Sequence, residues 1–402
     1  MKYLIILGDG MADEKIPELG NMTPLEYAET PYMDLIAQHS RMGMLKTVPE
    51  GFHPGSEIAN MSILGYDIKS TYEGRGVLEA ASMGVPVYSR EIAMRCNLIC
   101  IENGIIKNHS AGHITTEEAS ALINHLSDKL GNDFISFYTG VSYRHLLKLR
   151  NGDKNILCTP PHDVPGIPFK DVLVKPLSKN AEKTAALIND LIIQSQKLLQ
   201  THPINKKRIQ EGKDPANSIW PWSPGCKPSM PKITDLFNLK NGVVISAVDL
   251  IRGIGIYAGL KSVVVEGVTG LWNTNYEGKA QAAIKAIHDN DFVFLHIEAS
   301  DEAGHEGDYA LKVKTIENLD KKICRPIIEA VNNMNESVSI AVLPDHPTPC
   351  RIRTHTASAV PFMIWRQGTI PDGIATFNEF TAQKGSYGTL YNNEFITEFL
   401  RQ

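Results

Sequence analysis

The sequence predicts an α/β fold in which a mostly parallel sheet is sandwiched by helices and a smaller α+β domain is inserted into the chain. Three observations support this prediction. Short apolar runs recur along the chain, amphipathic helical patterns lie between them, and the middle of the chain has a different pattern from its two ends. Near-continuous apolar runs are typical of strands buried on both faces, and strands that alternate with helices favour a parallel sheet.

The runs that we interpret as parallel strands each end in polar or glycine-rich sequence. They cover residues 3–7, 243–246, 262–265, 292–297 and 339–343. Helical periodicity is found between them, for example over residues 276–288 and 310–334. In sheets of this kind ligands bind beyond the carboxyl ends of the strands, so we expect the functional residues to follow these runs.

The middle of the chain predicts a separate domain. Residues 92–106 and 133–149 have the pattern of antiparallel strands, and residues 115–130 and 180–201 that of amphipathic helices. Residues 202–231 contain prolines every few positions, so we interpret them as an irregular return linker whose two tryptophans anchor a hinge. We therefore expect a sheet domain formed by residues 1–85 and 235–402, interrupted by an inserted domain with its return linker at 86–234.

Composition excludes several classes of protein. The 402 residues are 43% hydrophobic and 21% charged, with a net charge of −5, which argues against disorder and against a nucleic-acid partner. No apolar run is long enough to span a membrane, and the apolar run at residues 3–7 is too short for a signal peptide. Six scattered cysteines with no CxxC pair favour a reduced cytoplasmic location. Composition leaves the oligomeric state open.

Two candidate residues lie in the amino-terminal part of the chain. Asp9 follows the first predicted strand between two glycines, where it is either a turn former or a ligand. Ser56 stands at the start of a helical pattern, after Pro and Gly. It is either a helix cap or a nucleophile, because a helix amino terminus stabilises an anion and a nearby metal ion would lower the pKa of the hydroxyl.

Five further candidates follow the fourth and fifth predicted strands. Asp301 and His305 would share one face of a helix, and a carboxylate with an imidazole suits Mn²⁺ or Zn²⁺. Asp345 and His346 are adjacent and would point in different directions, so each could serve a different metal ion. His355 lies in a polar loop. Because parallel strands end at one edge of their sheet, we expect these groups to lie close together.

Several motifs together resemble the cofactor-independent phosphoglycerate mutases, and the closer match is to the shorter archaeal-type branch. The motifs are GDGM at 8–11, GSEIANMSILGYD at 55–67, SAVDLIRGIG at 246–255, GLWNTNYEGK at 270–279, SDEAGHEGD at 300–308 and PDH at 344–346. The resemblance covers nearly the whole chain. It implies an alkaline-phosphatase-like sheet domain with an inserted substrate-binding domain, and a role in glycolysis and gluconeogenesis.

The resemblance also implies roles for individual residues. Ser56 would accept the phosphoryl group as phosphoserine during the interconversion of 3-phosphoglycerate and 2-phosphoglycerate. Two divalent ions, Mn²⁺ first and Zn²⁺, Co²⁺ or Mg²⁺ as alternatives, would be bound, one by Asp9, Ser56, Asp345 and His346 and the other by Asp301, His305 and His355. Substrate would be bound by His113, Arg144 and Lys227.

Two other activities use the same residue types. One is a homoserine kinase-like phosphotransferase of the same family, and the other is a metal-dependent phosphatase. The ligand residues do not separate the mutase from the kinase-like activity, because the acceptor pocket decides between these two. A phosphatase would release phosphate and form no 2-phosphoglycerate. A degenerate, non-catalytic binding protein is disfavoured because all seven expected ligand positions are present.

Overall fold

The computed structural model describes residues 1–401 and divides the chain into two compact units. The first unit comprises Met1–Tyr72 and Ser229–Gln402, and the second comprises Glu73–Pro228. Both boundaries come earlier than the expected positions near 85 and 235. The reason at the first boundary is α5 (Arg75–Ser82), which packs against β3 (Glu91–Glu102), β6 (Arg144–Arg150) and β9 (Ser218–Gly225) of the second unit.

The first unit is built on an eight-stranded sheet. Its strands are β1 (Lys2–Gly8), β2 (Ser40–Lys46), β10 (Gly242–Ile245), β11 (Lys261–Val263), β12 (Phe292–Ile297), β13 (Val338–Leu343), β14 (Val360–Arg366) and β15 (Thr389–Tyr391). The order is β11-β10-β12-β1-β13-β14-β2-β15, and β14 is antiparallel to both of its neighbours while the other pairs are parallel. The mostly parallel α/β fold is confirmed, and the five apolar runs are five of its strands. The sequence analysis did not anticipate β2, β14 and β15.

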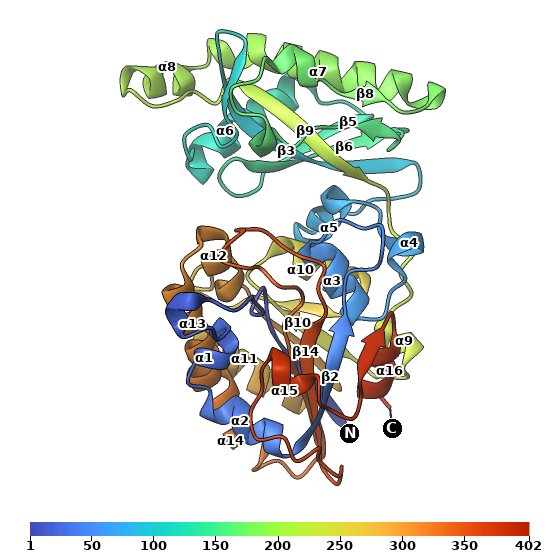
Figure 1. The fold of residues 1–402 in the computed structure, drawn as a ribbon. Helices are drawn as coiled ribbons and strands as arrows, with labels where there is room; N and C mark the ends of the chain where they lie inside the picture. Colours follow the sequence, from blue (N-terminus) through green and yellow to red (C-terminus); the bar gives the residue numbers. More distant parts are fainter. Residues whose placement is uncertain (402) are drawn as a thin grey trace. The chain divides into compact units, whose positions relative to one another are not determined.

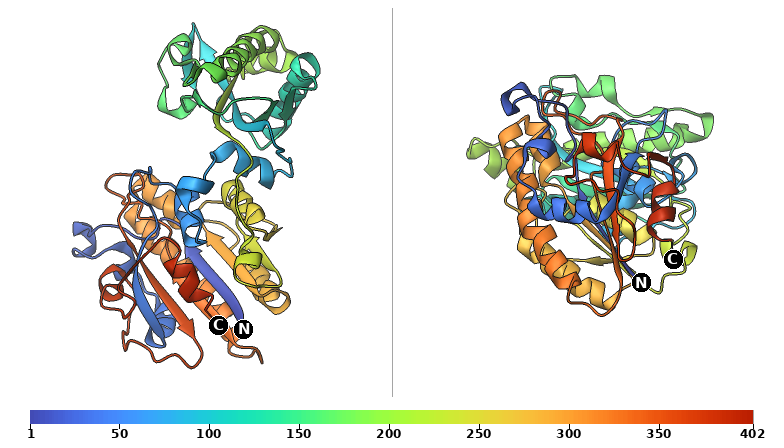
Figure 2. Two further views of the ribbon diagram at one scale, coloured as in Figure 1. Left: turned by 90° about the vertical axis from the view of Figure 1, so that its right-hand side faces the viewer. Right: turned by 60° about the horizontal axis from the view of Figure 1, so that its bottom comes forward.

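Helices cover both faces of this sheet (Figure 1). They are α1 (Pro24–Tyr27), α2 (Pro31–Gln38), α3 (Ser56–Ile63), α4 (Ile68–Thr71), α9 (Ile233–Leu236), α10 (Asp249–Tyr257), α11 (Tyr276–Asp289), α12 (Ala299–Glu306), α13 (Tyr309–Leu319), α14 (Arg325–Val331), α15 (Glu379–Ala382) and α16 (Glu394–Phe399). Leu4 and Ile6 of β1 belong to the core shared with α2, α11 and α13. On the other face, the ring of Tyr3 meets that of Phe399 at 5.6 Å, and α16 lies beside β1 (Figure 2).

The helical pattern expected over 310–334 is interrupted. A π-helical turn at Asp320–Cys324 separates α13 from α14. Pro326 stands in the first turn of α14 and has no backbone N–H, so a regular α-helical hydrogen bond is missing there. The wider turn also holds the carboxylate of Asp320, which accepts the backbone N–H of Met33 at 2.6 Å. Proline and this contact together account for the break.

The second unit has an antiparallel sheet of five strands. Its elements are α5, β3 (Glu91–Glu102), β4 (Ile105–Asn108), α6 (Thr116–Leu130), β5 (Ile135–Tyr138), β6 (Arg144–Arg150), the short pair β7 (Ile156–Leu157) and β8 (Lys175–Pro176), α7 (Glu182–Gln200), α8 (Pro203–Gln210) and β9 (Ser218–Gly225). Its core is made by both strands and helices, with α6 and α7 supplying apolar side chains such as Leu122 and Ile188.

The expectation that residues 202–231 form an irregular linker is wrong. Residues 203–210 are α8, and β9 pairs with β3 in register, with Pro221 opposite Cys96. Proline is tolerated because β9 pairs with β3 alone and is therefore an edge strand. Trp220 and Trp222 are 1% and 5% exposed and lie in the core of the second unit, so they are core residues rather than a hinge anchor.

Candidate metal centre

The register of the central strands brings the predicted ligands to one edge of the sheet. Gly8 of β1 pairs with Ile297 of β12, and Leu7 pairs with Leu343 of β13. The segments that carry Asp9, Asp301 and Asp345 therefore leave the sheet at the same level. This is the arrangement that parallel strands predict, and all seven proposed ligands belong to the first unit.

The first group of ligand atoms is formed by Asp9, Asp345 and His346, each at most 1% exposed. Nε2 of His346 lies 3.6 Å from Oδ1 of Asp9 and 3.4 Å from Oδ2 of Asp345. The backbone N–H of Gly10 donates to Oδ1 of Asp345 at 3.1 Å. Oδ1 of Asp9 is buried with no hydrogen-bond partner in the structure. A buried carboxylate oxygen without a donor suits a cation ligand.

The second group is formed by Asp301, His346 and His355, with His305 beside it. Helix α12 begins directly after β12 and places Asp301 and His305 one turn apart. Nε2 of His305 lies 3.2 Å from Oδ2 of Asp301 and 2.9 Å from Nε2 of His355, which is 3.4 Å from Oδ1 of Asp301. Asp301 and His305 therefore lie on the same face of α12, as their spacing predicts. His346 belongs to both groups of ligand atoms.

The titration behaviour of the carboxylates reflects this crowding. Burial raises the pKa of Asp9 well above its usual range, and the charges of Asp345 and Asp301 raise it further. Burial also raises the pKa of Asp301, but hydrogen bonds from His305 and His355 outweigh it and hold that pKa well below its usual range. The hydrogen bond to Asp301 raises the pKa of His305 to about 9. Divalent cations would relieve the repulsion among these carboxylates, so the donor set fits such ions.

Ser56 is the first residue of α3, and Gly55 precedes it as the helix cap. Its hydroxyl lies 3.2 Å from Nε2 of His346. Of the two sequence interpretations, the side chain does not cap its own helix, and it faces the ligand groups instead. The first turn of α3 offers backbone N–H groups to an anion that reaches the hydroxyl.

Gly10 allows the ligands to approach one another. Its φ is +60°, and a Cβ there would lie 2.5 Å from Oδ1 of Asp301 and 2.6 Å from Oγ1 of Thr348. Any other residue would therefore be strained in its backbone and would displace a ligand. This is the reason that glycine follows Asp9.

Sequence reasoning missed several polar residues that surround the ligands. Asn60 donates to the backbone oxygen of Ser56 at 2.8 Å and to Oδ2 of Asp345 at 2.9 Å. The hydroxyl of Thr348 donates to Oδ1 of Asp301 at 2.5 Å. His296 is fully buried against Asp9. A histidine inside a fully apolar strand such as β12 is a signal that could have been read from the sequence.

The predicted substrate residues belong to the second unit and form a separate set. His113 lies between β4 and α6 with a φ of 52°, Arg144 opens β6, and Lys227 follows β9. All three side chains are exposed. They remain candidates for binding an anionic substrate.

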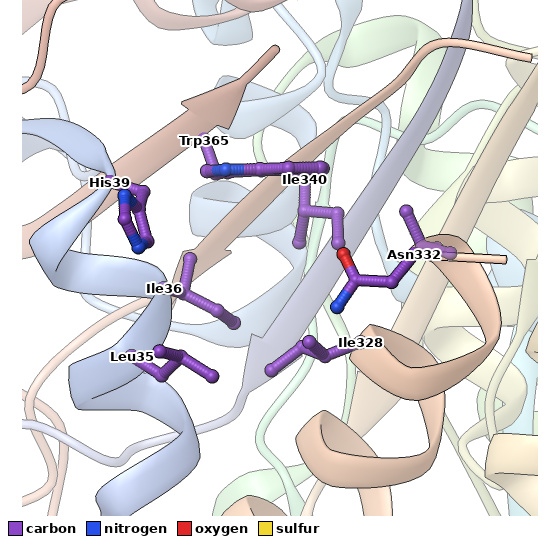
Figure 3. Close-up of a pocket in the computed structure, with 8 residues that line it drawn as sticks. Leu35, Ile36, His39, Ile328, Asn332, Ile340 and Trp365 are labelled. Carbon is purple, nitrogen blue, oxygen red and sulfur yellow. The ribbon is translucent and has the colours of Figure 1, made fainter. Parts of the chain in front are cut away.

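An apolar cavity of about 170 Å³ lies elsewhere in the first unit (Figure 3). Trp365, Ile340 and Ile36 are among its lining residues, and its polar groups are His39 and Asn332. Ile340 lies early in β13, whereas Asp345 follows the end of that strand. The cavity is therefore separate from the metal ligands.

No helix in the described part of the chain is long and apolar enough to cross a membrane.

Comparison with known proteins gives concordant results. A family model described as 2,3-bisphosphoglycerate-independent phosphoglycerate mutase matches residues 37–205. A protein of that name from Methanosarcina acetivorans is 50% identical over 98% of both chains, and one from Methanothermobacter thermautotrophicus, with the suffix 2, is 43% identical over 97% of this chain and 94% of its own.

Two solved structures have the same fold. A protein from Pyrococcus horikoshii superposes with a TM-score of 0.83 at 30% identity, covering 99% of this chain and 97% of the other. A cofactor-independent phosphoglycerate mutase from Thermoplasma acidophilum superposes with a TM-score of 0.70 at 25% identity, covering 100% and 99%. The similarity therefore spans both units.

Proposed function

The chain belongs to the 2,3-bisphosphoglycerate-independent phosphoglycerate mutase family, and from this premise we propose that it interconverts 3-phosphoglycerate and 2-phosphoglycerate through a phosphoserine at Ser56. The observation that supports the chemistry best is the position of the Ser56 hydroxyl, 3.2 Å from His346 and at the amino terminus of α3. A nucleophile at a helix amino terminus beside cation ligands suits phosphoryl transfer.

The proposal includes two divalent cations. Asp9, Ser56, Asp345 and His346 would hold one, and Asp301, His305 and His355 the other. When bound, the ions supply positive charge that lowers the pKa of the Ser56 hydroxyl and neutralises the phosphoryl oxygens. Mn²⁺ is the ion that we propose, since mixed carboxylate and imidazole ligands suit it, with Zn²⁺, Co²⁺ and Mg²⁺ as alternatives.

The protein's own groups position the transfer. The hydroxyl of Ser56 gives up its proton and its oxygen forms a bond to phosphorus, while the bond from phosphorus to the glycerate oxygen breaks and the glycerate oxygen takes up one proton in exchange. The glycerate turns, its 2-hydroxyl oxygen attacks the phosphoserine, and Ser56 recovers its hydroxyl proton. Asn60 donates hydrogen bonds to the backbone of Ser56 and to the carboxylate of Asp345, so it fixes the position of the nucleophile relative to this ligand.

We assign the handling of glycerate to the second unit. His113, Arg144 and Lys227 are exposed groups able to bind carboxylate or phosphate oxygens. Retention of glycerate and exclusion of water are what distinguish a mutase from a phosphatase, and we propose that these three residues and their unit act as a lid during turnover. We also propose a cytoplasmic location, in keeping with six cysteines that are all free.

The test is an assay of the purified protein with 3-phosphoglycerate and Mn²⁺, without added 2,3-bisphosphoglycerate. Formation of 2-phosphoglycerate is the expected result. Release of inorganic phosphate without 2-phosphoglycerate would indicate a phosphatase, and turnover of homoserine with ATP would indicate the kinase-like activity. Either of these outcomes would replace the proposal.

A further inference from the structure

His296 connects two segments that end at the ligand edge of the sheet. It lies in β12, between β1 and β10, and is 0% exposed. Nε2 of His296 lies 2.8 Å from Oδ2 of Asp9, and Nδ1 lies 3.1 Å from the hydroxyl of Ser246. Ser246 directly follows β10, whose Ile245 pairs with Leu295. The sheet register therefore places serine, histidine and aspartate in one line.

The hydrogen bonds along this line favour one tautomer of His296. The hydroxyl of Ser246 accepts the backbone N–H of Val248 at 3.0 Å, so its own hydrogen is available for Nδ1 of His296. Nδ1 is then the acceptor, and Nε2 carries the hydrogen that it donates to the Asp9 carboxylate. With Asp9 ionised, as a cation ligand must be, the opposite tautomer would set a lone pair against the carboxylate oxygen at 2.8 Å.

The neighbouring histidines have the opposite arrangement. Nδ1 of His305 lies 3.0 Å from the backbone oxygen of Arg353, which can only accept, so Nε2 of a neutral His305 keeps its lone pair. The hydroxyl of Thr348 donates to Asp301, so it accepts from Nδ1 of His346 at 3.2 Å, which leaves a lone pair on Nε2 of His346. In the neutral form of each histidine, Nε2 is therefore the nitrogen available to a cation, whereas a His305 that carries a second proton donates it to Asp301.

We propose that His296 is a positioning residue which Ser246 holds in the Nε2–H form, so that it fixes one oxygen of Asp9 and leaves the other for a cation. The free oxygen is Oδ1 of Asp9, the buried atom without a partner. A donor that fixes one oxygen of a ligand carboxylate orients the other and preorganises the site. This inference rests on the metal site of the proposed function.

A buried lysine also contacts the backbone of His296. Lys279 of α11 is 0% exposed and donates from Nζ to the backbone oxygen of His296 at 3.2 Å. Lys279 comes from the GLWNTNYEGK motif and Ser246 from the SAVDLIRGIG motif, to which the proposed mechanism assigns no role. The proposal gives Ser246 a role, which is to hold the imidazole of His296. The hydrogen bond from Lys279 stabilises the backbone of β12 at His296.

The first experiment determines the histidine tautomers in the metal-free protein. Nitrogen-15 shifts of the imidazoles in the metal-free full chain, recorded at alkaline pH where Asp9 is ionised and His305 is neutral, should show Nε2–H for His296 and Nδ1–H for His346. A Ser246→Ala variant should mix or reverse the tautomer of His296 only. Finding Nδ1–H on His296 in the unaltered protein would overturn the proposal, whether or not the protein is a mutase.

The second experiment measures Mn²⁺ binding by calorimetry in the full chain. His296→Leu should weaken binding at one of the two sites about 10–100-fold, whereas His296→Gln, whose amide can donate to Asp9, should recover most of it. Activity of His296→Leu should return at higher Mn²⁺ concentration. Phe294→Leu in the same strand, 1% exposed, is the matched control for core damage and should bind Mn²⁺ normally.

The outcomes separate the two proposals. Tight Mn²⁺ binding by a folded His296→Leu variant would exclude the positioning role while leaving the metal site intact. Failure of the unaltered protein to bind Mn²⁺ would remove the metal site itself and this inference with it. If His296→Leu does not fold, the tautomer measurement on the unaltered protein still tests the positioning role of His296.

Discussion

The hydroxyl oxygen of Ser56 lies 3.2 Å from Nε2 of His346, although 290 positions separate the two residues in the chain. The contact joins the start of α3 to the loop after β13. It places a candidate nucleophile against a histidine that borders both groups of ligand atoms. The first prediction concerns this hydroxyl.

Ser56→Ala should lower mutase activity by more than about 10³-fold, because no other group stands in its place to accept the phosphoryl group. Mn²⁺ binding should persist, since Asp9, Asp345 and His346 remain. Ser62→Ala makes the same change later in α3 and should keep normal activity. Turnover of Ser56→Ala at the normal rate would refute the covalent route.

Divalent cations should stabilise the folded chain. Binding to the folded state alone stabilises it by about 2.7 kcal/mol when the ion is at 100 times its dissociation constant. We expect Mn²⁺ to raise the melting temperature of the metal-free protein in differential scanning calorimetry. Asp345→Asn should abolish much of this rise, whereas Asp171→Asn, an exposed change in the second unit, should not. An equal rise in both variants would argue against the ligand role of Asp345.

Gly10→Ala should destabilise the protein and impair metal binding together. The left-handed backbone at φ +60° costs an alanine about 1–2 kcal/mol, and its Cβ would collide with Asp301 and Thr348. Gly51→Ala is the control, because φ there is +86° and no atom lies within 4 Å of the added Cβ. Urea unfolding and Mn²⁺ titration of both variants measure the effects. The prediction fails if Gly10→Ala behaves like the control.

Asn60→Ala should lower kcat by about 10–100-fold while the chain stays folded. The change removes the two donated hydrogen bonds that tie the backbone of Ser56 to the carboxylate of Asp345. Circular dichroism would verify the fold, and steady-state kinetics with 3-phosphoglycerate would give kcat. An unchanged kcat would show that the position of Ser56 does not depend on this amide.

Acid should destabilise the second unit through His145. Burial lowers the pKa of this histidine to about 4, and its Nδ1 accepts the backbone N–H of Gly140 at 3.0 Å. Since the unfolded chain binds a proton near pH 6.5 and the folded chain does not, stability falls as the pH drops from 6.5 towards 4. The loss between pH 7 and 5 should be about 2 kcal/mol in urea unfolding.

His145→Asn tests this assignment, because the asparagine oxygen can accept from Gly140 but does not titrate in this range. The variant should lose most of the acid sensitivity that His145 contributes. Identical slopes for His145→Asn and the unaltered protein would contradict the prediction.

Much of the fold followed from local patterns. The runs at 3–7 and 292–297 are strands because continuous apolar sequence is stable only where both faces are buried, and helix α11 begins at Tyr276, where the pattern begins. Strand β9 was missed because its prolines are acceptable only at a sheet edge. That edge exists only once β3 has its other partners.

Strand and helix patterns are enough to predict which side chains follow the strands, and thus that Asp9, Asp301 and Asp345 meet at one edge of a parallel sheet. How each histidine is placed at this edge depends on contacts that exist only in the folded chain. His346 and His296 both face Asp9 through Nε2, and their second nitrogens meet different partners, Thr348 and Ser246. Ser246 lies 50 positions from His296, and Asp301, which orients the Thr348 hydroxyl beside His346, lies 47 positions from Thr348, so no local pattern encodes these contacts.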